Sequence, residues 1–381
     1  MYEAETLYRQ ILQAQPNHPL ANHNLGVIAM LTGYLEMALP YLQNAWRNSY
    51  QELFCRTLTE CLLRLDRVQE ALQIITNGVR ERKFSAQQTN WLLKLTTDIA
   101  ERKRPGIVVE HELSWFFNSG RHAELTHNLH GVLSEYPEWV DGWNMLCTTL
   151  QILGEDESAA LERVLELTPL DAEAAGRRKI FCIGANKTGT TSVESVFRGL
   201  GLVVGHQAKA EMLMFDWAKR DFRRIVRYCY AADAFQDVPF SVDDTFRELD
   251  RTFSNSKFIL TVRNNANEWY ESLVRFHTRM INRGRTPTAD DLRQYNYRYP
   301  GYLWDVTRLQ YGSDESRLYD RDTYIRWYEK YNNNIKDYFS GRPGDLLVLN
   351  VADPDAMERL LTFLGYPYTG QKMPHLNAAS G

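Results

Sequence analysis

The sequence lacks any run of eighteen or more apolar residues, which is the length that a membrane-spanning helix requires. Its first five residues include no lysine or arginine, so they lack the basic start of a secretory signal peptide. We therefore expect a cytoplasmic protein without a membrane span.

Cysteine is scarce, and none of it forms a C-x-x-C pair. The five cysteines are Cys55, Cys61, Cys147, Cys182 and Cys229. This usage argues against a disulfide framework and against a zinc site. We expect reduced, buried thiols and no bound metal.

An excess of positive charge is also missing, since the formal net charge is −4. Nucleic-acid-binding domains usually present a basic surface, so we expect no nucleic-acid partner. The basic run at residues 219–227 is predicted to be a helix with one solvated or cofactor-facing side.

The length of 381 residues, with 44% apolar and 24% charged residues, suits two domains that each have a sizeable core. Within residues 1–172, small and apolar residues recur at spacings close to the 34-residue tetratricopeptide period. They are Ala4, Tyr8, Pro16, Leu25, Gly26, Ala38, Leu42, Leu58, Ala71 and Ile75, with a later unit at Trp143, Leu146, Ala159 and Pro169. We expect a tetratricopeptide-like helical solenoid that docks a protein partner or a second copy of the chain. A plain bundle of amphipathic helices is the alternative.

The most informative segment is the small-residue stretch 184–192, with the sequence GANKTGTTS. It follows an apolar run at 179–183 and precedes a helix-like pattern at 193–200, so it is predicted to join a strand to a helix. The first N–H groups of a helix have no partner inside the helix, and the helix dipole adds positive character there. Such a loop is typical of a phosphate or sulfate site.

The order of residues in this loop separates two kinds of anion site. A nucleoside-triphosphatase loop places its lysine after the last glycine, whereas here Lys187 precedes Gly189, and Thr190 and Thr191 follow. This order resembles the K-[ST]-G-T-T loop of sulfotransferases that use 3′-phosphoadenosine 5′-phosphosulfate (PAPS). The resemblance implies that PAPS is the co-substrate and that 3′-phosphoadenosine 5′-phosphate (PAP) is the product.

A second segment is similar to the same family. Residues 256–263 are predicted to form a buried strand that ends in Arg263, and a helix with Ser272 follows. In the family, an arginine and a serine at these places hold the 3′-phosphate of the cofactor. Arginine suits this role because its planar fork donates several charge-assisted hydrogen bonds to a phosphate.

The resemblance nominates Asp237 as the base that accepts the acceptor's proton, since cytosolic sulfotransferases have an H-x-P segment where this chain has Asp237-Val-Pro239. A free aspartate has a pKa of about 3.9 and is a weak base unless burial raises that pKa. Two alternatives, His206 and Glu211, follow a predicted strand at 202–205, and they stay open. Lys187 is expected to stabilise charge on the departing oxygen.

The resemblance covers about residues 178–377. It implies that residues 177–381 form a P-loop three-layer α/β domain with a mostly parallel sheet. Together with the repeat pattern, this gives two domains, the helical solenoid at 1–172 and the α/β domain at 177–381. The cofactor-binding residues it implies are Asn186, Lys187, Thr188, Gly189, Thr190, Thr191, Ser192, Arg263 and Ser272. Two alternatives remain, namely a P-loop kinase or other phosphotransferase, and a tetratricopeptide scaffold with a nucleotide-sensing domain.

The acceptor is expected to carry a hydroxyl group, with an amine as the alternative. Residues 281–331 are rich in tyrosine and tryptophan and are predicted to cover the acceptor. Aromatic side chains with polar tips suit sugars, phenols and peptides equally well. The residue that stacks on adenine is not identified by the sequence.

Overall fold

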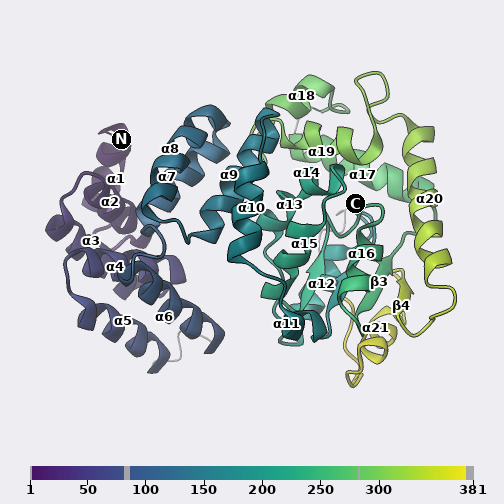
Figure 1. Cartoon of the computed structure of the whole chain (residues 1–381), viewed down its shortest axis with the longest axis horizontal. Helices are drawn as coiled ribbons and strands as arrows, with labels where there is room; N and C mark the ends of the chain where they lie inside the picture. The colour runs from purple at the N-terminus through teal and green to yellow at the C-terminus, as the bar shows by residue number, and fades with distance from the viewer. Residues whose placement is uncertain (1, 81–85, 282–283, 375–381) are drawn as a thin grey trace. The chain divides into compact units, whose positions relative to one another are not determined.

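The computed structural model describes residues 2–80, 86–281 and 284–374, so 81–85, within the predicted solenoid, and 375–377, at the end of the predicted sulfotransferase-like region, lie outside the described residues. The chain divides into two compact units (Figure 1). The first comprises Met1–Phe117 and Arg121–Leu146, and the second comprises Asn118–Gly120 and Cys147–Gly381. Among the described residues, no helix combines the length and the apolar character that crossing a membrane would require.

The first unit is helical. Its helices are α1 (Tyr2–Ala14), α2 (Pro19–Leu31), α3 (Leu35–Asn48), α4 (Glu52–Arg64), α5 (Val68–Arg80), α6 (Ala86–Ala100), α7 (Ile107–Asn118), α8 (His122–Glu135) and the first half of α9 (Val140–Leu153). Helices that follow one another from α1 to α6 pack together. Several positions of the predicted repeat, among them Ala38, Leu42, Leu58, Ala71 and Ile75, are fully buried in their core. The assignment of these helices to tetratricopeptide repeats stays a prediction.

The second unit contains a sheet with helices on both faces. Its elements after α9 are α10 (Ser158–Leu167), α11 (Ala172–Gly176), β1 (Ile180–Cys182), α12 (Thr190–Gly199), α13 (Gln207–Glu211), α14 (Met214–Ala218), α15 (Arg223–Tyr228), η1 (Cys229–Ala231), β2 (Ala234–Gln236), α16 (Thr245–Thr252), β3 (Lys257–Thr261), α17 (Ala266–Ile281), α18 (Ala289–Gln294), α19 (Tyr302–Tyr311), α20 (Arg321–Tyr338), β4 (Leu346–Leu349) and α21 (Ala356–Leu364). The predicted domain bounds, 1–172 and 177–381, stay a prediction.

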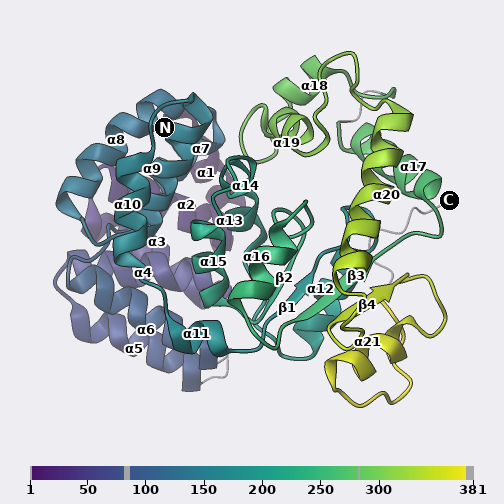
Figure 2. The same ribbon diagram turned by 45° about the vertical axis from the view of Figure 1, so that its right-hand side comes forward.

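The four strands are parallel and lie in the order β2-β1-β3-β4 (Figure 2). Alternate residues of each strand point to opposite faces. Phe181, Phe235 and Phe258 share one core with α13 to α16 and α20, whereas Cys182 and Ile259 share the other core with α12 and α21. Because both faces are covered, the strands are mostly apolar, with polar residues only at strand ends, namely Gln236, Lys257 and Thr261. This pattern is typical of a parallel sheet in an α/β domain.

The strands predicted at 179–183 and 256–263 are confirmed as β1 and β3. The strand predicted at 202–205 is not formed, since only the single bridge between Val204 and Ala234 joins this segment to the sheet. The segment reaches the sheet edge beside β2 and continues into α13, so only one residue pair comes into register.

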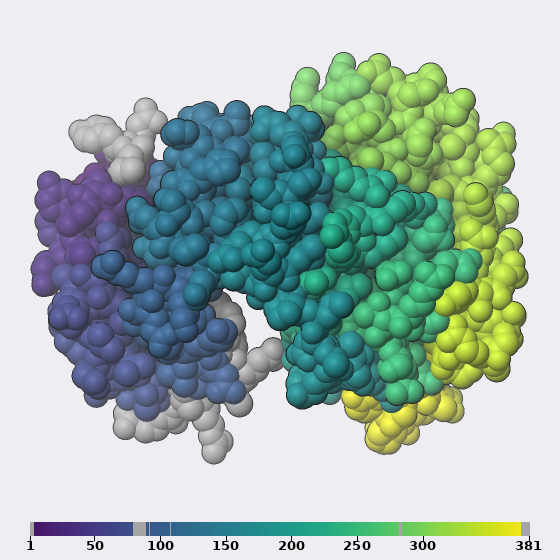
Figure 3. All heavy atoms as spheres, viewed as in Figure 1, coloured from purple at the N-terminus to yellow at the C-terminus, as the bar shows by residue number. Residues whose placement is uncertain are grey.

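The segment between α17 and α20 contributes α18 and α19 and gathers at one end of the second unit, light green in the space-filling view (Figure 3). Its aromatic side chains pack against one another. The rings of Tyr311 and Tyr324 are stacked with centroids 4.3 Å apart, and Trp327 lies edge-on to Tyr311 at 4.8 Å. Tyr324 and Trp327 belong to α20, and the same cluster includes Ala185, Trp269 and Leu273, so the segment packs onto α17, α20 and the loop after β1.

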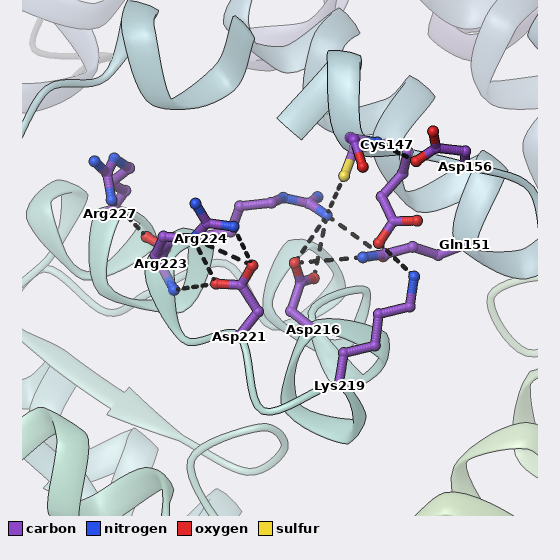
Figure 4. Close-up of polar contacts among 11 residues, drawn as sticks. Cys147, Gln151, Asp156, Asp216, Lys219, Asp221, Arg223, Arg224 and Arg227 are labelled. Carbon is purple, nitrogen blue, oxygen red and sulfur yellow. Dashed lines mark hydrogen bonds and ion pairs between the residues drawn. The ribbon is translucent and has the colours of Figure 1, made fainter. Parts of the chain in front are cut away.

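The basic run at 219–227 does not have the predicted solvated or cofactor-facing role as a whole, because Arg224 is buried. Its Nη1 lies 3.1 Å from Asp216 Oδ2, and both side chains are almost fully buried (Figure 4). Arg224 also donates to Thr148 Oγ1 at 2.9 Å and contacts Cys147 Sγ at 3.1 Å. Gln151 Nε2 donates to the Asp216 carboxylate at 3.5 Å. This cluster fastens the second half of α9 to α14 and α15.

Candidate functional site

The predicted anion loop leads from β1 into α12 through two residues in left-handed conformations. Lys187 has φ 72° and Gly189 has φ 105°. Glycine adopts this region without steric cost, whereas a lysine there is uncommon and must be held by its surroundings. Gly184, at the start of the loop, has no room for a side chain, because a Cβ atom would lie 1.9 Å from Thr261 Oγ1.

Hydrogen bonds to neighbouring elements hold the loop in place. Thr188 and Thr261 share a hydrogen bond of 2.6 Å between their hydroxyls, and Thr188 Oγ1 also donates to the carbonyl of Ala185. Trp269 Nε1 donates to the carbonyl of Asn186 at 2.9 Å, and Ser241 Oγ bonds the Asn186 amide oxygen at 3.2 Å. The loop is therefore fixed before any ligand arrives.

Helix α12 begins directly after this loop. Its N-cap is Gly189, which has no side chain to accept hydrogen bonds from the first turn. Thr190 and Thr191, the first two helical residues, line a pocket of about 490 Å³. Unpaired N–H groups and the positive end of the helix dipole suit this part of the pocket to an anion.

Arg263 follows β3 and is bonded to the same loop. Its Nε donates to the carbonyl of Lys187 at 2.8 Å, and its backbone N–H donates to Tyr328 Oη at 3.0 Å. Its two Nη atoms have no hydrogen-bond partner among the residues that the structure describes, so that end of the guanidinium remains available to a ligand. Ser272, on α17, lines the same pocket.

The ammonium group of Lys187 stands over the ring of Phe276, with Nζ 3.2 Å from the ring centroid. An ammonium over an aromatic face is attracted by the ring's negative quadrupole. Burial lowers the pKa of Lys187, and the nearby Asp237 carboxylate opposes that shift. The lysine is thus held at the pocket wall, close to the predicted base.

Asp237 is half-buried and lies directly after β2, with a left-handed φ of 65°. One carboxylate oxygen accepts from the backbone N–H of Val238 at 2.8 Å. Burial, followed by the charge of Glu211, raises the pKa of Asp237 to about 6. A carboxylate with this pKa is a far better proton acceptor at neutral pH than an exposed aspartate.

The two alternative bases differ in position. Glu211 lines the pocket, but its carboxylate is engaged by Arg298 and Gln207, and it accepts from Tyr297 Oη at 3.4 Å. His206 is the N-cap residue of α13, and its carbonyl accepts from Tyr228 Oη at 2.8 Å. His206 is not among the described residues that line the pocket.

Most of the predicted site residues lie together in this one pocket. Thr188 and Ser192 do not line it, since both are buried against the protein interior. The pocket brings together Asn186, Lys187, Gly189, Thr190, Thr191, Glu211, Asp237, Arg263 and Ser272.

Several pocket residues on α17, among them Phe276 and His277, were not predicted from the sequence. His277 lines the pocket beside Lys187, shares a 2.7 Å hydrogen bond with Tyr319 Oη, and has its pKa lowered to about 4 by burial and then by Lys187. The spacing from Ser272 to Phe276 and Met280 puts these residues on one helix face and would have predicted the Phe276 contact. His277 carries no comparable signal in the sequence.

Comparison with known families matches residues 179–381, more than half of the chain, to the sulfotransferase domain. No curated protein matches the chain. The matched region contains the β1–α12 loop, Arg263 and the whole pocket. The chain therefore belongs to the sulfotransferase family, and it is a transferase of sulfuryl groups.

Proposed function

We propose that the protein transfers the sulfuryl group of PAPS to a hydroxyl group, with an amine as the alternative acceptor. One observation carries the proposal. The left-handed turn into α12 and the guanidinium of Arg263, which come from segments 76 residues apart, are joined by a hydrogen bond between two residues that line one pocket. The pocket thereby offers two anion-binding features, as a nucleotide with a 5′-phosphosulfate and a 3′-phosphate requires.

The residues fit such a nucleotide. The N-terminus of α12, with Thr190 and Thr191, suits the 5′-phosphosulfate. The Nη atoms of Arg263 and the hydroxyl of Ser272 suit the 3′-phosphate, because a guanidinium can donate two parallel hydrogen bonds to one phosphate. Thr188 and Ser192 support the loop from within instead of facing the ligand.

When bound, PAPS supplies the sulfuryl group, whose bond to the bridging phosphate oxygen breaks as a bond from the acceptor oxygen to sulfur forms. Asp237 accepts the proton that the acceptor hydroxyl loses. Lys187 offers its ammonium to the negative charge that develops on the departing oxygen. Asp237 and Lys187 are close enough to shift each other's pKa. Asp237 can therefore accept the acceptor's proton while Lys187 stabilises the departing oxygen of the same transfer.

Asp237 is preferred as the base over Glu211 and His206 because its environment supports that role. Its carboxylate accepts one backbone hydrogen bond, and its pKa is raised to about 6. The Glu211 carboxylate already has three partners. We propose that the Glu211 carboxylate orients Arg298 and Tyr297.

We further propose that the helices of the first unit are tetratricopeptide repeats that dock a protein partner or a second copy of the chain. The support is the burial of the small and apolar residues that recur with the repeat period. Size-exclusion chromatography with light scattering tests self-association directly.

Calorimetry with PAP, followed by transfer assays with labelled PAPS in excess EDTA, tests the donor assignment. We expect PAP to bind and the transfer to continue in EDTA. Phosphoryl transfer that needs ATP and magnesium would favour the kinase instead. Tight PAP binding without turnover on any acceptor would favour a nucleotide-sensing scaffold.

A further inference from the structure

One face of α19 forms a wall of the pocket. Leu303, Val306, Thr307, Gln310 and Tyr311 all line the cavity. Their spacing of three and four residues places them on one side of the helix. The sequence had singled out this aromatic segment, but the donor-binding features described above do not use it.

Three polar groups on this face lack partners. Thr307 Oγ1, Gln310 Nε2 and Tyr311 Oη have no hydrogen-bond partner among the described residues, and the Gln310 side chain is only 6% exposed. Buried polar groups in folded proteins are almost always hydrogen-bonded, so an unpaired buried amide needs an explanation. Rotation of the terminal amide lets either its oxygen or its nitrogen face the cavity.

Other parts of the wall around this face are aromatic and acidic. The rings of Tyr297 and Tyr302 lie 5.8 Å apart, and Tyr302 Oη donates to the Glu211 carbonyl at 3.3 Å. The carboxylate of Asp237 lines the same cavity. Burial, the neighbouring Tyr324 and then Asp237 raise the pKa of Tyr311, so its hydroxyl stays protonated as a hydrogen-bond donor.

These features distinguish between a simple phenol and a polyhydroxylated ring as the acceptor. A simple phenol has one oxygen, which Asp237 would engage, and it offers no hydrogen-bond partner to the polar groups of α19. A polyhydroxylated ring presents an apolar face to a tyrosine ring and hydroxyls around its edge to the polar groups. The walls of the cavity therefore match the second class.

We infer that the α19 face is the acceptor subsite and that it takes a polyhydroxylated ring such as a sugar, with Thr307, Gln310 and Tyr311 binding hydroxyls beside the one that is sulfated. This inference rests on the proposed function. Sites that are built to hydrogen-bond a hydroxyl discriminate strongly against analogues that lack it.

A binding experiment on the full chain with PAP present tests the subsite without requiring turnover. The probes are a panel of methyl glycosides of glucose, galactose, mannose and glucosamine, compared with 4-nitrophenol by saturation-transfer NMR. We expect at least one glycoside to bind about tenfold more tightly than 4-nitrophenol. A higher affinity for 4-nitrophenol, or no bound glycoside on a protein that binds PAP, overturns the inference.

Substitution of Gln310 gives the second arm. Gln310→Met keeps the volume and removes the amide, so we expect glycoside affinity to fall at least fivefold while PAP affinity and thermal stability are kept. Gln294→Met, the same change at an exposed position outside the pocket, serves as the control. Unchanged glycoside affinity in Gln310→Met, or a loss that only follows unfolding in the melt, would refute the role. Tyr311→Phe provides an independent variant that removes only a hydroxyl.

The arms also separate this inference from the proposed function. Glycoside binding that depends on Gln310 without any labelled transfer from PAPS would leave the subsite standing and reject the donor assignment. PAP binding and sulfuryl transfer to 4-nitrophenol in preference to every glycoside would reject the subsite and leave the donor assignment standing.

Discussion

The guanidinium of Arg263 is hydrogen-bonded to the backbone of Lys187, with 2.8 Å between its Nε and the lysine carbonyl. This bond makes the two separate sequence motifs parts of one structure. A change at Arg263 therefore affects the ligand contact and the loop that carries Lys187.

Arg263→Ala should weaken PAP binding at least tenfold, because a hydrogen bond to a charged group contributes about 1.5–3 kcal/mol. Calorimetry on the folded variant measures this. Arg251→Ala, which removes an exposed arginine on α16 away from the pocket, is the matched control and should bind PAP normally. Equal PAP affinity in the two variants would remove Arg263 from the phosphate site.

Asp237→Asn should lower turnover by about 10²–10⁴ while PAP affinity changes little, because the amide cannot accept a proton. In the unchanged protein, kcat/KM should rise with pH through about 6, since the base acts only when it is ionised. Glu211→Gln and His206→Ala should have smaller effects on turnover. If either of these two variants is inactive while Asp237→Asn still turns over, the base has been misassigned.

The same substitution should stabilise the fold at alkaline pH. The pKa of Asp237 is about 6 in the folded chain and about 3.8 without the fold, so the folded state binds the proton more tightly. Stability is then lost as pH rises from about 4 to 6, and ionisation costs the fold up to about 3 kcal/mol above pH 6.

Melting curves of Asp237→Asn and the unchanged protein at pH 4.5 and pH 8 check this effect. We expect the variant to gain stability over the parent at pH 8 and much less at pH 4.5. Glu271→Gln, at an exposed pocket position, should show no such difference. A variant that is less stable at pH 8 would show that the ionised carboxylate is stabilising.

Gly184→Ala should destabilise the second unit by about 1–3 kcal/mol or more, because its methyl group would collide with the side chain and backbone of Thr261. Gly199→Ala is the matched control, since nothing lies within 4 Å of its Cβ position. Denaturant titration compares the two variants. Equal free energies of unfolding would mean that β1 and β3 can move apart to admit the methyl group with little loss of stability.

Part of the site could be predicted from the sequence because its residues sit at fixed places in a regular pattern. An apolar strand followed by small residues and a helix signal defines the loop at 184–189. Arg263 follows a second strand, and the ends of parallel strands meet at one sheet edge. The relation between Lys187 and Arg263 is therefore a consequence of strand order.

Other features depend on packing between distant segments and leave no local pattern. The burial that raises the pKa of Asp237 and the contact of Lys187 with Phe276 are of this kind. Within the basic run at 219–227, the prediction was wrong for Arg224, because charge alone does not reveal that this side chain points inward to Asp216. Residues 202–205 are apolar enough for a strand but lie where only one residue pair meets β2.

A fragment that starts at Val140 should bind PAP, whereas one that starts at Asp171 should aggregate or melt early. The shorter fragment removes Thr148 and Gln151 and leaves the buried Arg224–Asp216 pair without two of its partners. Calorimetry and melting curves on both fragments check this. Equal stability of the two would show that the cluster contributes little.

Helix α9 contributes its residues up to Leu146 to the first unit and its residues from Cys147 onward to the second, so a cut at this boundary would divide a helix. Chimeras that exchange the helical region for another adaptor must therefore leave the last turns of α9 with the transferase and graft the new sequence upstream of them. The helix from Val140 to Leu153 contributes residues to both units, so an engineered transferase has to retain it.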